Sequence, residues 1–178
     1  LYVTCGSLNQ ITREQVEYAV KECGFACRHL TMEQKLCPAY YETPEGKAFI
    51  GEIVKLCETE KKIVVDTFDG EEDIHEYRMI HGIPQADVRF LISESHGHIV
   101  KEIVDRRMDV TVLMTGGGTL MGYMKLIGCT QLEPVCEIEP GVVVSMLVWN
   151  GYRQQVISKS GGFGTEDIMG RIAQKIVK

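Results

Sequence analysis

The sequence predicts an α/β fold, with a layered, mostly parallel or mixed sheet flanked by helices and a β-hairpin near the C-terminus. Two observations lead to this prediction. Short apolar runs, typical of buried strands, alternate with segments of helical periodicity through the first 126 residues. A β-branched run at 142–149 is followed by Asn150-Gly151, which favours a hairpin turn, and by a returning strand at 154–158.

Composition indicates one globular domain over residues 1–178. The chain is 44% hydrophobic and 25% charged, which is ordinary for a globular protein. A formal charge of −6 argues against nucleic-acid binding, which needs a basic face. No apolar run approaches the roughly 18–20 residues of a membrane span, so we expect no membrane association and a cytoplasmic location. The seven cysteines form no C-x-x-C motif, so neither disulfides nor a zinc site is expected.

The strands and helices follow from apolar periodicity. Predicted strands cover residues 1–5, 25–30, 63–67, 110–113, 142–149 and 154–158. Predicted helices cover residues 12–23, 47–57, 99–104 and 120–126, with a last one starting at 165–167. The first helix is expected to open at Thr12, because Thr12 and Gln15 read as a capping box, and to stop at Gly24. We expect loops at 35–46 and 68–83, the latter with a weak helix.

Two histidines invite a chemical interpretation. His96 and His98 lie in a Ser-Glu-Ser-His-Gly-His stretch that is expected to precede a helix, and two histidines in a loop can chelate a metal. Exposed residues near a helix N-terminus are the more common interpretation. A Cys or Ser nucleophile paired with these histidines is a further alternative, although no G-x-S-x-G motif is present.

Three glycine-rich turns follow predicted strands. They are Gly6-Ser7, Gly116–Thr119 and Lys159–Gly164. Such turns bring backbone N–H groups to an anion, since glycine leaves no Cβ in the way and a helix N-terminus favours phosphate. Thr119 could cap its helix or donate a hydroxyl, and Lys159 supplies a point charge suited to phosphate. The alternative is a set of simple connecting turns.

The glycine turns do not match the common nucleotide fingerprints. The sequence has no G-x-x-x-x-G-K-[ST], and Gly116, Gly118 and Gly122 miss the dinucleotide spacing by one residue. Ligands of open α/β sheets nevertheless bind beyond the carboxyl ends of strands, where all three turns are expected to lie. Their combination therefore favours a phosphate or nucleotide site.

With these turns placed, the chain resembles the C-terminal, nucleotide-binding domain of the four-carbon acid sugar kinase family over essentially its whole length. Three stretches carry the resemblance: Cys5-Gly6-Ser7 with residues 12–15, Thr115 to Thr119, and Ser158 to Gly164 with Asp167. The resemblance implies an ATP-dependent kinase that uses Mg²⁺. It implies ATP contacts by Ser7, by Gly116, Gly117, Gly118 and Thr119, and by Gly161 or Gly162 of the third turn. The phosphate role of Lys159 is inferred from its position beside that turn.

The sequence departs from the family pattern in two ways. Gly118 stands where the family usually has an acidic residue, and nothing here matches the family's N-terminal Asp-Asp-x-Thr-Gly domain, which binds the acid. We therefore expect the C-terminal half of a two-domain kinase, inactive alone, with the sugar acid bound mainly by the other half and no catalytic residue assigned. A homodimer is a further expectation. The alternatives are a non-catalytic nucleotide-sensing or interaction domain, and an unrelated metal- or thiol-dependent hydrolase using His96, His98 or a cysteine.

Overall fold

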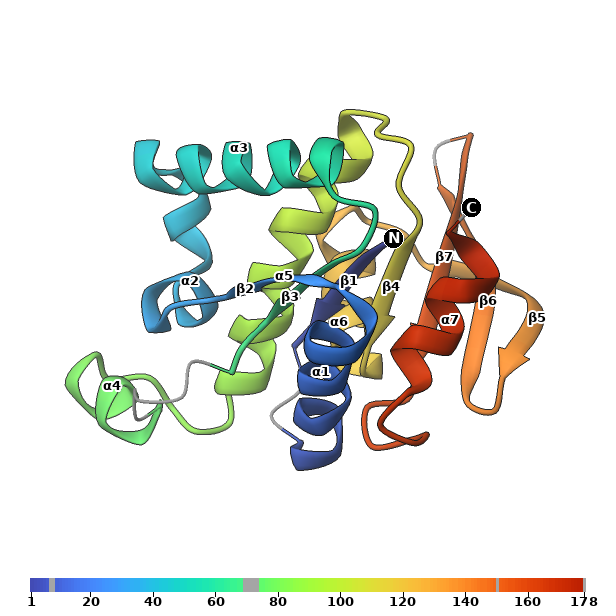
Figure 1. Ribbon diagram of the computed structural model, residues 1–178. Coiled ribbons are helices and arrows are strands. Elements are labelled where there is room, and N and C mark those ends of the chain that lie inside the picture. Colours follow the sequence, from blue (N-terminus) through green and yellow to red (C-terminus); the bar gives the residue numbers. More distant parts are fainter. Residues whose placement is uncertain (7–8, 69–73, 150, 178) are drawn as a thin grey trace.

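A single sheet forms the centre of the protein (Figure 1). The computed structural model describes residues 1–6, 9–68, 74–149 and 151–177. Within these ranges the sheet has seven strands in the order β2-β3-β1-β4-β7-β6-β5. The strands are β1 (Tyr2–Cys5), β2 (Ala26–His29), β3 (Ile63–Asp66), β4 (Val112–Thr115), β5 (Gln131–Glu139), β6 (Val142–Trp149) and β7 (Tyr152–Lys159). The helices are α1 (Gln10–Cys23), α2 (Met32–Leu36), η1 (Pro38–Glu42), α3 (Pro44–Thr59), α4 (Ile74–Ile80), α5 (Val88–Asp105), α6 (Gly117–Leu126) and α7 (Ile168–Ile176).

The strand directions confirm the predicted α/β class. β2, β3, β1, β4 and β7 run parallel to one another, whereas β6 is antiparallel to both β7 and β5. The hairpin after residue 149 joins β6 to β7, and β7 then pairs in parallel with β4. The C-terminal hairpin is thus continuous with the parallel part of the sheet.

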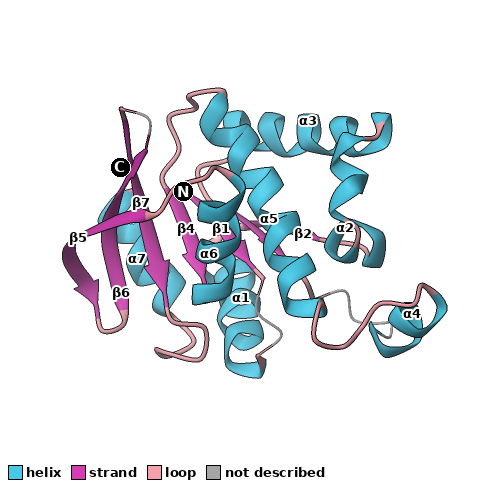
Figure 2. Ribbon diagram, turned by 180° about the vertical axis from the view of Figure 1, so that it is seen from behind, coloured by secondary structure: helices cyan, strands magenta, loops and turns pink. Residues whose placement is uncertain are grey.

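Helices cover both faces of the sheet. α1 and α7 lie on the face seen in Figure 1, and α5 and α6 lie on the face seen in Figure 2. Alternate residues of the central strands therefore pack into two different cores. Val3, Val64 and Leu113 face α1 and α7, whereas Val65 and Met114 belong to the core under α3, α5 and α6. Burial on both faces explains why these strands read as continuous apolar runs.

The start of α1 differs from the sequence expectation. The helix begins at Gln10 after Asn9, whose side chain accepts a hydrogen bond from the Ile11 N–H, so Asn9 and not Thr12 is the N-cap. Thr12 lies inside the first turn and is fully buried. The C-terminal end is as predicted, since Gly24 caps it in the left-handed conformation at φ 66°.

The predicted loop at 35–46 is wrong in part. Thr31 and Gln34 form a capping box that starts α2, and Thr43 caps α3 with Pro44 at its first position. Proline is favourable there because its missing N–H needs no partner and its φ is already helical. Pro38 likewise stands at the start of η1, so both prolines of this segment mark helix starts instead of a loop.

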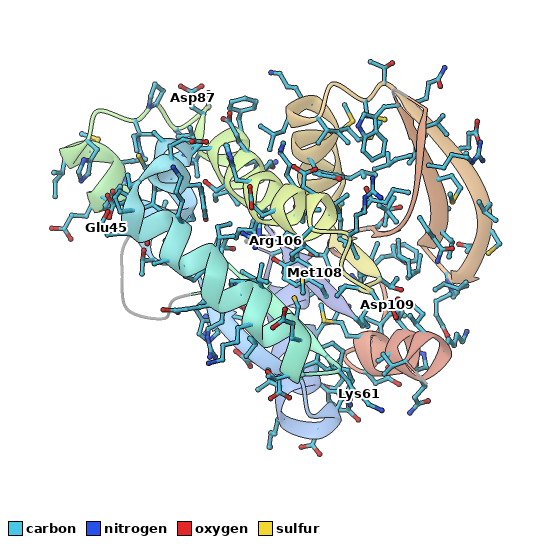
Figure 3. All side chains as sticks on the ribbon, turned by 90° about the horizontal axis from the view of Figure 1, so that it is seen from above. Glu45, Lys61, Asp87, Arg106, Met108 and Asp109 are labelled. Carbon is cyan, nitrogen blue, oxygen red and sulfur yellow. The ribbon has the colours of Figure 1, made fainter. Side chains whose placement is uncertain are left out.

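The largest difference concerns α5, which runs from Val88 to Asp105 and includes the Ser93–His98 stretch expected to precede it. Figure 3 shows it between Asp87 and Arg106, beside α3. Gly97 lets the stretch pack closely against α6, since a Cβ there would lie 3.3 Å from the Cα atom of Tyr123 on α6. The small and polar residues of this stretch therefore indicate close packing against α6, and not a loop.

The segment expected to be irregular contains α4, none of whose residues is buried, and residues 69–73 lie outside the described ranges. Across the described ranges, each helix is too short or too polar to cross a bilayer.

Candidate functional site

The three glycine turns meet in one cavity at the carboxyl edge of the sheet. β1, β4 and β7 are adjacent and parallel, so Gly6 after β1 lies beside the turns that follow β4 and β7. The cavity has a volume of about 590 Å³. It is lined by Gly6, Asn9, Gln85, Val88, Arg89, Ile92, Ser93, Thr115, Gly116, Gly118, Thr119, Gly161 and Gly162. Its size and its position at strand ends are those of a small-molecule site in an open α/β sheet.

Three helices begin at this cavity. Asn9 caps α1, Val88 opens α5, and Gly116 precedes α6, and all three residues line the cavity. The first N–H groups of a helix lack intrahelical partners and carry partial positive charge. The cavity therefore offers several N–H groups of favourable polarity to an anion.

The central turn needs glycine at its first position. Gly116 has φ 87° and ψ 131°, a conformation that side chains rarely adopt. Gly118 lies close to the opposite wall, since a Cβ there would be 3.3 Å from the Ser93 hydroxyl oxygen. Gly117 does not line the cavity, its φ is not positive, and a Cβ there would meet nothing within 4 Å. The need for positive φ therefore falls on Gly116, not on Gly117.

Two threonine hydroxyls border this turn. The Thr119 hydroxyl is buried and donates to the Thr115 carbonyl oxygen at 3.0 Å, so it stabilises the turn without capping α6. Thr115 lines the cavity, and its fully buried hydroxyl has no hydrogen-bond partner among the described residues. A buried hydroxyl left unpaired is costly. A ligand that reaches this hydroxyl from the cavity would supply the missing partner.

The charges of the cavity favour an anion although the protein is acidic. Arg89, on the first turn of α5, lines it, and none of the described lining residues is an aspartate or glutamate. Arg89 and its neighbours on α5 were not predicted as site residues, because the helix was predicted to begin only at residue 99 and its first turns were therefore missed.

Lys159 lies beside the cavity but is not among its lining residues. Its side chain is buried, and Nζ donates to the carbonyl oxygens of Ser160 at 2.8 Å and Gly161 at 3.2 Å. Burial lowers the pKa of Lys159 to about 8. In this structure the lysine fixes the backbone of the third turn, and its charge lies behind that turn.

Helix α1 fixes the same turn from the other side. The Thr12 hydroxyl donates to the Gly161 carbonyl oxygen at 2.5 Å, and Gln15 Nε2 donates to the carbonyl oxygens of Phe163 and Gly164 at 3.0 and 2.9 Å. The sequence did suggest a pairing of Thr12 with Gln15, but as a helix cap. Both residues share the buried face of α1 with Val16, and this pattern indicated a contact with another part of the fold.

The two candidate histidines point in different directions. His96 is fully buried, and its Nδ1 lies 2.7 Å from the Thr4 hydroxyl oxygen. Burial lowers the pKa of His96 to about 3, so the ring is neutral at physiological pH. His98 instead stacks on Tyr41 with ring centroids 5.5 Å apart and lines a second cavity. The structure therefore does not bring the two rings together as a chelating pair.

The predicted ATP-contacting residues are thus partly brought together. Gly116, Gly118, Thr119, Gly161 and Gly162 line one cavity, Gly117 and Lys159 are adjacent to it, and Ser7 lies outside the described residues. Mg²⁺ prefers oxygen ligands and is often held by one or two carboxylates together with substrate phosphates. The described residues of the cavity offer hydroxyl groups but no carboxylate.

Solved structures share this fold. A protein from Bordetella bronchiseptica with a domain of unknown function (DUF1537), solved as a domain-swapped dimer with bound citrate, is 19% identical and has a TM-score of 0.69. Similar values hold for a Haemophilus influenzae protein described with DUF1537 (19%, 0.69) and a putative tRNA synthase from Salmonella typhimurium LT2 (16%, 0.68). These matches cover 98%, 99% and 98% of this chain, but 40% of each of the three neighbours.

No curated protein sequence matches the chain. A family profile does match, over residues 2–169, which includes all three glycine turns. Since this match covers nearly the whole chain, the protein belongs to the family described as the nucleotide-binding C-terminal domain.

Proposed function

We propose that this chain binds ATP in the cavity between the glycine turns and is the nucleotide-binding half of a kinase for four-carbon sugar acids of the threonate, erythronate or oxo-tetronate type. The observation that carries the ATP site is a cavity where three helices begin and the described lining residues include no carboxylate. The unpaired hydroxyl of Thr115, which is one of the lining residues, adds to it. The kinase activity and the acid follow from the sequence resemblance.

The cavity has two kinds of wall, which suit the two ends of a nucleotide. Gly116, Gly118 and Thr119 form the side at the start of α6, where N–H groups and the Thr115 hydroxyl suit phosphate oxygens. Val88 and Ile92 of α5 form an apolar wall suited to a base. Mg²⁺ would then be held mainly by the phosphates and water, since the described lining residues of the cavity include no carboxylate.

The acceptor acid belongs to the remainder of a longer enzyme in this proposal. The chain corresponds to 40% of each solved neighbour, which leaves room for a second domain in proteins of that length. Phosphoryl transfer depends mostly on positioning and charge neutralisation, so separating the acceptor from the nucleotide removes most of the rate advantage. This chain would position ATP and contribute Arg89 as a cation, and a second domain would present the hydroxyl in line with the γ-phosphate.

Calorimetric titration with ATP and adenosine tests the site. Gly118→Leu should abolish binding of both ligands, because its side chain enters the cavity where a Cβ is already 3.3 Å from the Ser93 hydroxyl. Gly117→Leu is the matched control, one residue away on the same helix with open space around it, and should retain binding. Equal affinities of the two variants for ATP would refute this location.

ADP release with a panel of four-carbon acids tests the kinase half of the proposal. The chain alone should bind ATP without acid-dependent turnover, and turnover should appear when it is joined to the acid-binding domain of its parent protein. Turnover by the chain alone would overturn the two-domain division. ATP binding without turnover in the joined protein would favour the nucleotide-sensing alternative.

A further inference from the structure

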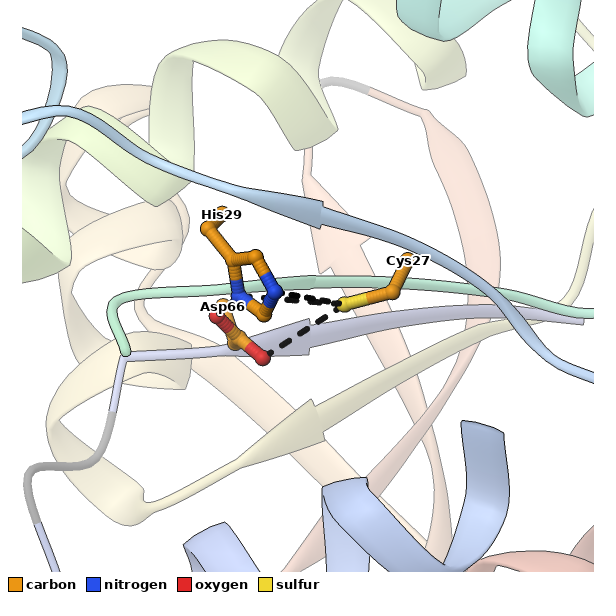
Figure 4. A group of neighbouring side chains, drawn as sticks. All are labelled: Cys27, His29 and Asp66. Carbon is orange, nitrogen blue, oxygen red and sulfur yellow. Dashed lines mark hydrogen bonds and ion pairs between the residues drawn. The ribbon is translucent and has the colours of Figure 1, made fainter. Parts of the chain in front are cut away.

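A separate cluster of ligand-type side chains lies at the edge of the sheet, on strands β2 and β3. The parallel register places His29 opposite Asp66 and Cys27 opposite Val64. Residues two apart on a strand project to the same face, so Cys27, His29 and Asp66 gather on one face near the carboxyl end of these strands (Figure 4). Among the described residues, Cys27, His29 and Asp66 form the one group of three or more His, Cys, Asp or Glu side chains that lie close enough together to hold one ion.

We propose that Cys27, His29 and Asp66 form a binding site for one transition-metal ion of the Zn²⁺ type. The identity of the donors supports this class of metal. A sulfur, an imidazole nitrogen and a carboxylate oxygen are the ligands that zinc takes in proteins, whereas Mg²⁺ and Ca²⁺ select oxygen alone. Three protein ligands leave a fourth position for water, as in zinc sites that are open to solvent.

The distances fit this assignment. Cys27 Sγ lies 3.7 Å from Asp66 Oδ2 and 3.8 Å from each ring nitrogen of His29. Ligand atoms about 2.0–2.3 Å from a tetrahedral zinc ion are separated from one another by roughly 3.3–3.6 Å. The distances from the thiol sulfur to the other two groups are therefore within a few tenths of an ångström of those in a zinc site.

Asp66 also orients the histidine. His29 Nδ1 is 2.6 Å from Asp66 Oδ1, which is a hydrogen-bond distance and too short for two ligands of one ion. In the metal-free protein a proton joins this pair, and Nδ1 is the ring nitrogen that faces the carboxylate. An ion bound by Nδ1 would take the place of that proton, the ring proton would shift to Nε2, and Nδ1 and the carboxylate oxygen would move apart to roughly 3.3 Å.

The side chains of the group differ in burial, and this difference suits a site that exchanges its ion with solvent. The Asp66 side chain is fully buried, whereas the His29 side chain is 53% exposed, so an ion can reach the group from solvent. The Cys27 sulfur and the Asp66 carboxylate oxygen Oδ2 are 3.7 Å apart. A divalent cation would offset the repulsion between the two anionic forms. Its binding would convert Cys27–SH to a metal-bound thiolate and release that proton to solvent.

The same three residues could instead be read as a cysteine nucleophile with its base. The structure disfavours that reading, because a reactive cysteine lies in electropositive surroundings. The Cys27 thiol instead lies within hydrogen-bonding distance of the Asp66 carboxylate, which stabilises the protonated form. The site lies apart from the ATP cavity, none of whose lining residues belongs to it, so its test is independent of the proposed kinase function.

Cobalt(II) titration of the chelator-treated 178-residue chain tests the proposal, since a cobalt–thiolate bond gives a charge-transfer band that carboxylate or histidine ligands alone do not give. We expect one cobalt per chain, the thiolate band, and its displacement by Zn²⁺. Cys27→Ser should remove the band, and His29→Ala should lower the affinity at least about tenfold. Both positions lie on the edge strand and are not fully buried, so these variants should fold; circular dichroism checks this.

Cys57→Ser is the matched control, because Cys57 is also a partly buried free thiol and lies on α3. It should keep the band and the affinity. No thiolate band in the wild-type chain, or a band that survives Cys27→Ser, would overturn the proposal. Rapid iodoacetamide labelling of Cys27 at neutral pH in the metal-free chain, with no zinc protection, would also overturn it and favour the nucleophile.

Discussion

Alanine substitution at two adjacent glycines should have opposite effects on stability. Gly116 holds φ 87° and ψ 131°, close to a region that only glycine populates freely, so Gly116→Ala should lower the free energy of unfolding by about 1–3 kcal/mol. The backbone causes this cost, because the nearest atom to the new Cβ, the Thr119 hydroxyl oxygen, is at an ordinary 3.9 Å. Gly117 is the first helical residue with open space around it, so Gly117→Ala should raise the stability by up to about 1 kcal/mol.

Urea unfolding of the two variants and the wild-type chain, without nucleotide, measures the effect. The midpoints should separate in the order Gly117→Ala, wild type, Gly116→Ala, with an unchanged slope, which shows that the surface exposed on unfolding has not changed. The variants should differ from each other by about 1–4 kcal/mol. A Gly116→Ala chain as stable as the wild type would refute the assignment of strain to this residue.

Three further predictions follow from the charges and hydrogen bonds around the cavity. The folded-state pKa of Lys159 is lowered from 10.5 to about 8, so the unfolded chain binds more protons between these two pH values. The stability of the wild type relative to Lys159→Met should therefore rise with pH across that window. A difference in urea midpoints that does not change with pH would contradict this prediction. In calorimetric titration, Arg89→Ala should weaken the binding of ATP by about 1.5–3 kcal/mol and the binding of adenosine far less. Arg153→Ala, on β7, should change the binding of neither ligand. Equal losses for both ligands would show that Arg89 does not contact phosphate. Gln15→Met should lower the free energy of unfolding by about 1–3 kcal/mol in urea, because two carbonyl groups lose their donor, and an unchanged midpoint would show that water replaces it.

The fold class and the position of the cavity could be predicted because they depend on local patterns. The apolar runs that became β1, β3 and β4 are buried on both faces, and the Asn150-Gly151 signal lies between β6 and β7. Once the strands are parallel, the turns after them must lie at one edge, so Gly116 and Gly161 could be expected near each other although 45 positions separate them in the sequence.

What could not be predicted depends on which faces of the elements meet. The helical Ser93–His98 stretch looks like a loop because it is rich in small and polar residues. These residues allow close contact with α6, as Gly97 against Tyr123 shows. Lys159 looks like a phosphate ligand because its sequence neighbours are glycines, whereas its hydrogen bonds are to the backbone of its own turn. Cys27 and Asp66 come together only through the register of two strands, which neither segment specifies alone.

The cavity consequently exists only when the whole sheet is formed. Its three turns follow strands from the beginning, the middle and the end of the chain, and buried polar groups from α1 and Lys159 hold the last turn in place. A ligand that binds only this arrangement stabilises the folded state by mass action, about 2.7 kcal/mol at a concentration one hundred times its Kd. Such stabilisation should extend to β1 and β4 together, because neither can unfold and leave the cavity intact. Hydrogen exchange that slows with ATP only in the loops, and not in these strands, would contradict this coupling between sheet and site.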